Sequence, residues 1–308
     1  MEYDMIALGE TMVALAPPPG ASVRAADRWL VDHAGAESNT CVGLARLGLR
    51  VAWVSRLGDD AAGELILDAL VSEHVDTRWV QRDPHRPTGL MLKEPHHGVQ
   101  YYRTGSAASV MAPEILDGVA VAEARAVLVT GVTALVGAAP QATGLALLDA
   151  ARGIRIVDPN LRQGLWGSHR RAELVRPFIE RCDLLLGGIG ELEEILEAGS
   201  PGRAGGAGKA GRDGGAEALA RRAATCGPRE VVVRGTTMIG ALGDGVWHLL
   251  DIRRDRAVDP IGAGDAFNAG YIAARLRGEG VDTALRAGIT CGAAVTTGVS
   301  DTAGFPRP

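Results

Sequence analysis

Residues 126–131 read AVLVTG and residues 154–160 read IRIVDPN, and both are short runs rich in Val, Ile and Leu. Runs of the same kind recur along the chain: MIALG at 5–9, VAWVSRLG at 51–58, DLLLGG at 183–188 and EVVVRG at 230–235. Segments of helical character separate them. Nearly continuous apolar strands that alternate with helices are typical of a parallel sheet covered on both faces. The sequence therefore predicts an α/β fold.

Helices are predicted wherever apolar residues recur with helical spacing. The predicted helices span residues 37–48, 61–73, 140–152, 170–181, 190–198, 214–225, 264–277 and 281–297. Residues 199–213, GSPGRAGGAGKAGRD, have no apolar period, and we expect them to form a mobile surface loop.

Residues 77–104 break the α/β pattern. RWVQR, TGLMLKE and VQYYRTG are short strands with alternating polar residues, and prolines interrupt them. We expect them to form a small antiparallel sheet, together with residues 11–32, that projects from the edge of the core. Such a sheet is either a lid over a site or a plain edge hairpin.

The composition of the 308-residue chain excludes several classes of protein. With 46% apolar and 22% charged residues, the chain is neither disordered nor fibrous. A formal net charge of −5 gives little attraction to nucleic acid, so no nucleic-acid partner is expected. The cysteines lie far apart in apolar or small-residue runs, which is typical of reduced cysteines in a cytoplasmic protein: Cys41, Cys182, Cys226 and Cys291.

Residues 126–148 carry no charge and are long enough to span a bilayer. They also contain three glycines and Pro140, and they divide into a strand-like and a helix-like half. We interpret them as strand, turn and helix, so no membrane partner is expected. Glu2 and Asp4 stand where a secretory signal would have basic residues, which again favours the cytoplasm.

The strongest chemical signal is DPIGAGDAFN at residues 259–268. Gly262, Ala263 and Gly264 let the backbone turn tightly just before a predicted helix, so that N–H groups converge at its positive end. Such an arrangement binds anions such as phosphate. Asp265 is either an ordinary carboxylate at a helix start or a general base that accepts the proton of an attacking hydroxyl in phosphoryl transfer.

Other nucleotide and metal signatures are absent from the sequence. Phe267 stands three positions after Gly264, and no G-x-G-x-x-G follows MIALG, which disfavours a Rossmann dehydrogenase. RAGGAGKA at 203–210 is close to a P-loop but has Ala210 where Ser or Thr binds magnesium. The motifs H-R-D, D-F-G and H-E-x-x-H are missing too, which excludes protein kinases and zincins.

DPIGAGDAFNAG at 259–270 resembles the C-terminal signature of the ribokinase-like carbohydrate kinases, the PfkB family. GAESNTCVGLARLG at 35–48 is similar to the family's N-terminal sugar-binding signature, and the resemblance covers nearly the whole chain. It implies a ribokinase-like three-layer α/β/α core with a mostly parallel sheet and a small antiparallel β lid. It also implies ATP and Mg²⁺ as cofactors, and leaves open whether a monovalent cation such as K⁺ assists.

Within the family, GAESN at 35–39, YYRTGSAAS at 101–109 and DPNLRQGLW at 158–166 resemble the group that phosphorylates 2-dehydro-3-deoxy-D-gluconate (2-keto-3-deoxygluconate). Arginines suit such a sugar acid because a carboxylate needs cationic partners. Met91 stands where sugar-acid kinases can present a tyrosine from the lid. The substrate-binding residues that the resemblance implies are Gly35, Asn39, Tyr102, Arg103, Arg162 and Asp265.

The resemblance also implies where the nucleotide and the metal bind. RGTTMIG at 234–240 is similar to the family's K-x-G-x-x-G loop, although an ordinary β-hairpin turn has the same pattern. In DLLLGGIGELEEILE, Gly190 takes the Asn place of the family's N-x-x-E magnesium region, which leaves Glu193 as the implied metal ligand. The implied nucleotide contacts are Asn160, Arg234, Gly235, Gly240, Gly262 and Gly264.

Three functions remain open from the sequence. The first is an ATP-dependent kinase that phosphorylates the terminal hydroxyl of 2-dehydro-3-deoxy-D-gluconate. The second is another ribokinase-like kinase, for 5-dehydro-2-deoxygluconate, fructose or a nucleoside. The third is a non-catalytic sugar sensor, which the presence of Asp265 disfavours. In each case the free edges of the lid strands predict a homodimer, or a multiple of a dimer, through the lid.

Overall fold

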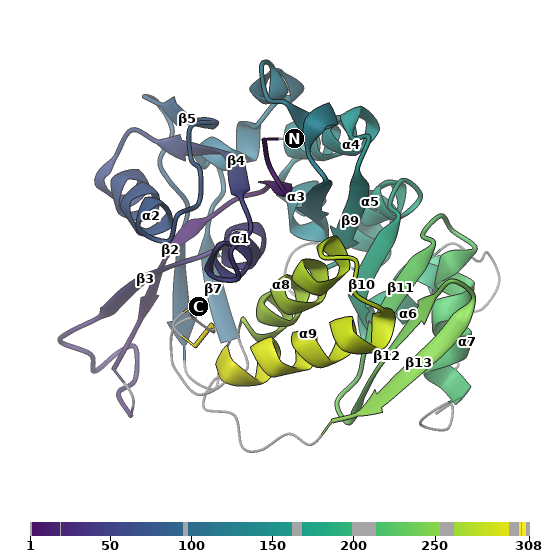
Figure 1. Cartoon of the computed structure of the whole chain (residues 1–308). Helices are drawn as coiled ribbons and strands as arrows, with labels where there is room; N and C mark the ends of the chain where they lie inside the picture. The colour runs from purple at the N-terminus through teal and green to yellow at the C-terminus, as the bar shows by residue number, and fades with distance from the viewer. Residues whose placement is uncertain are drawn as a thin grey trace.

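The computed structural model describes residues 2–18, 20–94, 98–161, 168–198, 214–252, 262–295, 302 and 304–305. Its largest feature is a nine-stranded sheet that runs through the molecule (Figure 1). In spatial order the strands are β13 (Val246–Asp251), β12 (Met238–Gly243), β11 (Glu230–Arg234), β10 (Leu184–Gly188), β9 (Ile154–Asp158), β8 (Ala126–Thr130), β1 (Met5–Leu8), β4 (Val51–Gly58) and β5 (Val80–Asp83). Neighbours from β11 to β5 are parallel, and β12 and β13 add an antiparallel hairpin at one edge.

The central strands are buried on both faces, as their apolar sequences predict. In β1, Met5 and Ala7 belong to one buried apolar cluster, whereas Ile6 and Leu8 belong to another. Because successive side chains of a strand point to opposite faces, the two clusters lie on opposite sides of the sheet. The predicted α/β fold with a mostly parallel sheet is thereby confirmed.

Helices cover both faces and complete a three-layer arrangement (Figure 1). One apolar cluster includes residues of α1 (Ala36–Arg46), α2 (Ala61–Ser72), α8 (Ala263–Leu276) and α9 (Val281–Val295). The other includes residues of α3 (Gly131–Val136), α4 (Ala138–Ala150), α5 (Ser168–Ile179), α6 (Ile189–Ala198) and α7 (Gly214–Ala224). The predicted helices match these bounds to within two residues at each end, and among the α-helices of the described residues only the short α3 was not predicted.

A second sheet, which we call the lid sheet, projects from the side of the core (Figure 1). Its order is β3 (Leu30–Ala34), β2 (Met12–Ala16), β6 (Leu90–Glu94) and β7 (Gly98–Tyr102). The β2–β3 and β6–β7 pairs are antiparallel, and a parallel contact between β2 and β6 joins them. Residues 80–83 of the predicted lid segment instead form β5 of the main sheet, because they pair in parallel with β4.

The uncharged stretch 126–148 forms β8, α3 and most of α4, which is the predicted strand, turn and helix. Among the residues that the structure describes, no helix combines the length and apolar character needed to cross a membrane. The predicted loop at 199–213 lies outside the described residues.

Candidate active site

A pocket lies between the lid sheet and the carboxyl ends of the central strands, the edge where open α/β sheets bind ligands. The lid sheet and the residues next to it line the pocket with Met12, Ala34, Met91, Lys93, Val99, Tyr101 and Arg103. The core side of the lining consists of Glu10, Gly35, Ala36, Asn39, Val132 and Asp265. The helical residues of this second group come from the first turns of α1, α3 and α8.

Asp265 lies in the first turn of α8 and lines this pocket. The helix begins after Gly262, whose φ of +84° lies in the left-handed region that favours glycine. Backbone N–H groups in a first helical turn have no partner within the helix, so residues 263–265 present donors at the positive end of α8. The structure therefore brings the predicted base and the predicted anion site, Gly262, Ala263 and Gly264, into one helical turn.

Asn39 reaches the same carboxylate from α1. Its Nδ2 donates a hydrogen bond of 2.9 Å to Asp265 Oδ2. Its Oδ1 is buried and accepts no hydrogen bond from the residues that the structure describes. Gly35, just before α1, packs so closely on the chain after β1 that a Cβ would lie 2.6 Å from the Glu10 carbonyl oxygen. Asn39 thus lies beside Asp265 with an unused acceptor, and Gly35 lines the same pocket.

Glu37 connects α1 to the central sheet and was not singled out from the sequence. Its Oε1 accepts hydrogen bonds from Thr130 N at 2.9 Å, Thr130 Oγ1 at 2.8 Å and Thr133 Oγ1 at 3.0 Å. Burial of this carboxyl group raises the pKa of Glu37 above its ordinary value. These contacts hold the start of α1 against β8 and α3, and so fix the helix that carries Asn39.

Arg103 is the main cation on the lid side of the pocket. It forms a buried ion pair with Glu10, and Ser106 Oγ donates a hydrogen bond of 2.7 Å to Glu10 Oε1. The guanidinium carbon also lies 5.7 Å from the centroid of the Tyr101 ring. Arg103 Nε donates no hydrogen bond within the described part of the chain. Lys93 is a second buried cation in the same lining.

Tyr102, a predicted substrate residue, is placed outside the pocket. Its side chain is 58% exposed, and its hydroxyl donates a 3.2 Å hydrogen bond to Gln100 Oε1. Side chains alternate along β7, so Tyr101 faces the pocket and Tyr102 faces away. The tyrosine of the pocket is therefore Tyr101, and the alternation that separates the two was readable from the sequence.

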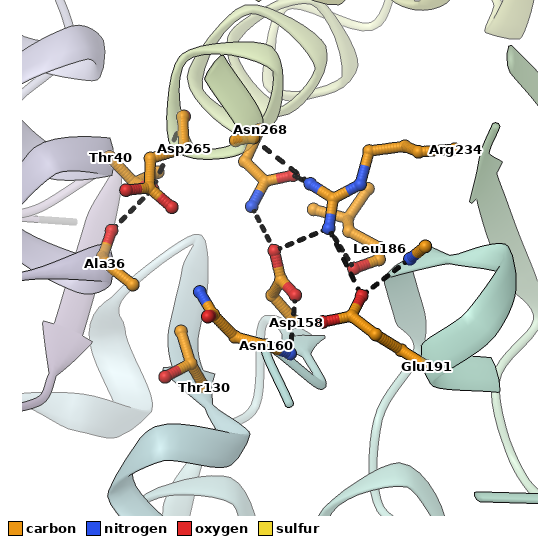
Figure 2. Close-up of polar contacts among 12 residues, drawn as sticks. Ala36, Thr40, Thr130, Asp158, Asn160, Leu186, Glu191, Arg234, Asp265 and Asn268 are labelled. Atoms are coloured by element: carbon orange, nitrogen blue, oxygen red, sulfur yellow. Dashed lines mark hydrogen bonds and ion pairs between the residues drawn. The ribbon is translucent and has the colours of Figure 1, made fainter. Parts of the chain in front are cut away.

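A buried polar network lies beside Asp265 at the carboxyl ends of β9 and β11 (Figure 2). Asp158 Oδ2 accepts hydrogen bonds from Arg234 NH2 at 2.9 Å and from Asn268 Nδ2 at 2.7 Å. Arg234 NH1 donates to Asn268 Oδ1 at 2.8 Å, which closes a triangle of three side chains. Asn160, with a φ of +39°, donates its backbone N–H to Asp158 Oδ1 at 2.9 Å. The predicted nucleotide residue Asn160 thus lies at this edge of the sheet.

Further predicted nucleotide residues belong to the 234–240 segment, and their contact with the nucleotide stays a prediction. The segment forms the β11–β12 hairpin, the alternative that its pattern also allowed, with a 2.9 Å hydrogen bond from Gly235 N to Met238 O. Gly240 lies within β12, where a Cβ would meet the Trp247 ring at 2.2 Å. Gly240 therefore serves packing, and the Arg234 side chain points inward with 15% exposure.

Glu193, the predicted metal ligand, is exposed and does not reach the network. Glu191 does, because its Oε2 lies 4.0 Å from Arg234 NH2. Its Oε1 accepts a hydrogen bond from Leu161 N at 2.8 Å, and its Oε2 accepts one from Gly188 N at 2.7 Å. Each residue of an α-helix turns the chain by about 100°, so residues two positions apart are separated by about 200° around the axis. Glu191 and Glu193 therefore cannot face the same site. Burial, followed by the negative charge of Asp158, raises the pKa of Glu191.

Two further predicted features lie outside the described residues. Arg162 belongs to the stretch 162–167, so its contact with the substrate carboxylate stays a prediction. Residues 253–261, which include the first three residues of the DPIGAGD motif at 259–265, are outside the described ranges as well, and the description of that motif begins at Gly262.

The sequence matches one protein family over most of its length. A model of the pfkB family carbohydrate kinases matches residues 4–308. The chain is 30% identical to a 2-dehydro-3-deoxygluconokinase of Bacillus subtilis (strain 168), over 99% of this chain and 93% of that protein. It is 29% identical to a 2-dehydro-3-deoxygalactonokinase of Haloferax volcanii, over 94% of this chain and 89% of that protein.

Solved structures have the same fold. A putative ribokinase II from E. coli, determined in complex with ATP and Mg²⁺, superposes with a TM-score of 0.86 over 99% of this chain and 96% of that one. The two are 20% identical, so the likeness concerns the ribokinase-like fold. Because the family model matches residues 4–308 and a relative that is 30% identical aligns with 99% of the chain, the chain belongs to the pfkB family of carbohydrate kinases and is an ATP-dependent sugar kinase.

Proposed function

We propose that the chain transfers the γ-phosphoryl group of ATP to the terminal hydroxyl of 2-dehydro-3-deoxy-D-gluconate. The observation that carries the proposal is the pocket itself. One wall holds Asp265 at a helix N-terminus, and the opposite wall holds two buried cations, Lys93 and Arg103. A general base and an anion site suit phosphoryl transfer, and lid cations suit an acidic sugar.

In the proposed reaction Asp265 accepts the proton of the substrate hydroxyl while the hydroxyl oxygen attacks the γ-phosphorus. The bond from that phosphorus to the β–γ bridging oxygen breaks, and ADP leaves with the bond's electron pair. The N–H groups of residues 263–265 stabilise negative charge on the transferring group. Asn39 Nδ2 orients the Asp265 carboxylate, and its free Oδ1 accepts a hydrogen bond from another sugar hydroxyl.

Recognition of the sugar acid is assigned to the lid side. Glu10 and Asp265 balance Lys93 and Arg103 in formal charge, so the described lining is neutral as a whole but polarised. Glu10 holds the Arg103 guanidinium in place, and Arg103 Nε is left without a hydrogen bond among the described residues. A substrate carboxylate directed toward the lid would gain charge-assisted hydrogen bonds there and would stay away from Asp265.

The residues present also fit one Mg²⁺ ion bound together with nucleotide phosphates. Mg²⁺ is usually bound through one or two carboxylates, retained waters and substrate phosphates. In the described ranges no group of three or more His, Cys, Asp and Glu side chains could hold a metal alone. Glu191, whose carboxylate lies near that of Asp158, is the side chain that would hold the ion through water. When bound, Mg²⁺ neutralises phosphate charge.

Substrate preference tests the proposal. We would measure ATP-dependent ADP release in a coupled assay with 2-dehydro-3-deoxy-D-gluconate, its galactonate epimer, 5-dehydro-2-deoxygluconate, fructose and a nucleoside. We expect kcat/KM for 2-dehydro-3-deoxygluconate to exceed that for fructose by roughly tenfold or more, because a charge-assisted contact contributes about 1.5–3 kcal/mol. Preference for a neutral sugar would support the alternative kinases. Sugar binding without turnover of any substrate would support the sensor.

We also propose that the lid sheet joins two copies of the chain and that the kinase works in the cytoplasm, where ATP is available. Both β3 and β7 are edge strands of the lid sheet, and edge strands offer unpaired backbone groups. Three of the large apolar side chains that the structure leaves exposed lie on these strands, with 41% exposure for Leu30, 55% for Val31 and 58% for Tyr102. These features favour a lid edge that a second copy of the chain covers.

A further inference from the structure

The Arg234 side chain lies at the carboxyl end of β11 and is turned into the molecule (Figure 2). Its NH2 donates to Asp158 Oδ2 at 2.9 Å and to the Leu186 carbonyl at 3.2 Å. Its NH1 donates to Asn268 Oδ1 at 2.8 Å and to the Gly264 carbonyl at 3.3 Å. One guanidinium group therefore contacts β9, β10 and the start of α8 at once.

The contacts on α8 involve the turn that carries the chemistry. Gly264 directly precedes Asp265 and belongs to the anion site, and Asn268 lies one helical turn further along. Asn268 is in turn bound to Asp158, so the first turn of α8 is held to the sheet through both residues. Any shift of the guanidinium would be transmitted to the N–H groups and to the carboxylate that the proposed reaction uses.

Charge and shape both suit Arg234 to this position. Burial alone would lower its pKa, but the carboxylates of Asp158 and Glu191 outweigh burial and raise the pKa above its ordinary value. The planar guanidinium offers five donors in a fixed fork, whereas a lysine ammonium is a single point charge. Only the fork can bond the amide oxygen on α8 and the carboxylate on β9 from opposite sides.

β11 and α8 are joined a second time, at the ends of both elements that lie away from the pocket. Arg275, near the end of α8, donates to Glu230, the first residue of β11, at 3.1 Å from Nε and 2.8 Å from NH2. Arg275 lies far along α8 from Asp265, and Glu230 lies at the amino end of β11, opposite to the end that carries Arg234. The β11–α8 contact thus has two arginine links of similar chemistry, of which only the Arg234 link lies at the pocket end.

We infer that Arg234 is a positioning residue for phosphoryl transfer, which orients the first turn of α8 and with it Asp265 and the anion site. This inference rests on the proposed function of that turn. It replaces the role of nucleotide ligand that the sequence implied, since the side chain makes its contacts with protein groups. For NH1 or NH2 to bind phosphate instead, Arg234 would have to give up its contact with Asn268 or with Asp158, which is buried.

The test compares Arg234→Lys and Arg234→Met with the matched control Arg275→Met. We expect both Arg234 variants to lose kcat by roughly ten- to hundredfold, because small misplacements of reacting groups carry such losses. The dissociation constant for ADP, measured by calorimetry, should change by less than about threefold. Arg275→Met should lower the melting temperature while keeping kcat within about twofold of the wild type, since it breaks the link at the distant end.

Amide hydrogen exchange at residues 263–268 supplies a readout that needs no turnover. It should accelerate in Arg234→Lys and not in Arg275→Met, even if the chain phosphorylates none of the sugars offered. If Arg234→Met does not fold, Asn268→Ala removes part of the same link and should show the same pattern. A tenfold weaker ADP affinity with kcat unchanged would make Arg234 a nucleotide ligand. Equal effects of the Arg234 and Arg275 variants on kcat and exchange would make it a structural residue only.

Discussion

The two walls of the pocket differ in how firmly they are packed. On the core side, Asp265 belongs to α8 and Asn39 to α1. Both helices pack on the sheet and contribute residues to the apolar cluster that also includes α2 and α9. On the lid side, the buried cluster consists of Met12, Ala14, Ala34 and Met91, with Val99 and Tyr101 packed against it. A thinly packed sheet opens at lower cost than a deep core. In the proposed function the chemistry belongs to the more firmly packed core wall and substrate recognition to the lid wall, so we expect the lid wall to be the one that moves.

The polar groups of the two walls differ in the same sense. The core network is closed, because Asp158, Asn268 and Arg234 satisfy one another. In contrast, Arg103 Nε on the lid side has no hydrogen-bond partner among the described residues, whereas NH2 of the same side chain is ion-paired with Glu10. Closed buried networks rigidify a site, whereas unused donors are ready for a ligand.

The largest loss of activity is expected from a substitution on the core wall, the removal of the proposed base. We expect Asp265→Asn to lower kcat by about 10²–10⁴-fold, because the amide keeps the shape but accepts no proton. ADP and sugar affinities, measured by calorimetry, should stay near those of the wild type. A variant that retained more than about a tenth of wild-type kcat would show that Asp265 is an ordinary carboxylate at a helix start.

On the lid wall, removing Arg103 should change selectivity. We expect Arg103→Ala to lower kcat/KM for the sugar acid by roughly ten- to hundredfold, and to affect a neutral analogue much less, since a charge-assisted contact contributes about 1.5–3 kcal/mol. The control is Arg28→Ala, since the Arg28 side chain is 86% exposed and lies outside the pocket lining. Equal losses with both substrates would mean that Arg103 supports the fold through Glu10.

A smaller difference between the two walls is expected in how their amide hydrogen exchange responds to the substrate. Adding the sugar acid should slow amide exchange at residues 88–94 and 98–104 more than in β8 or β9, because a closing lid excludes water from the reacting groups.

The same strands predict the assembly state. Light scattering should report about twice the chain mass of 32.0 kDa, or a multiple of that dimer. Val31→Asp, at an exposed edge of the lid sheet, should shift that mass toward the monomer. Unchanged exchange together with a monomeric wild type would contradict both the lid and the dimer.

The smallest effect, a change in thermal stability, is expected from a substitution at the junction of the lid sheet and the core. Asp60 caps α2 by accepting from Gly63 N at 2.8 Å, and it accepts from Thr88 N at 2.8 Å just before β6. Burial would raise the pKa of Asp60, but these hydrogen bonds and the Arg82 charge outweigh it and lower the pKa below its ordinary value.

A carboxyl group whose pKa is lowered on folding binds fewer protons in the folded than in the unfolded state. Its contribution to stability is therefore present above the ordinary aspartate pKa and is lost as the pH falls through the lowered value. Asp60→Asn should melt a few degrees below the wild type at pH 7, and this difference should shrink as the pH is lowered from about 5 to 3. A constant difference across that range would argue against the assigned shift.

Much of the fold was predictable because it depends on local patterns. The apolar runs at 126–131 and 154–160 became β8 and β9, and the helices followed from their spacing. The two small-residue motifs also marked where α1 and α8 begin. The choice between near neighbours was not predictable in this way: Tyr102 was predicted where Tyr101 lines the pocket, and Glu193 where Glu191 approaches Arg234 of the network. The alternation of side chains along a strand and their rotation around a helix determine which of two neighbours faces the site. Either can be applied only once the register of the element relative to the site is known.

Other features have no signal in the sequence because they join distant segments. Lys93 and Glu10 line the pocket only because β6 pairs beside β2, and Glu37 has a role only because α1 lies against β8. Arg234 illustrates the same limit, since its contacts with Asp158 and Asn268 join β11 to β9 and α8. The sequence alone thus determined the α/β core, the lid segments and the Asp265 motif, which arise from local periodicity and glycine placement. Only the tertiary structure decided which side chains meet, because a buried charge takes its role from the partner that folding brings to it.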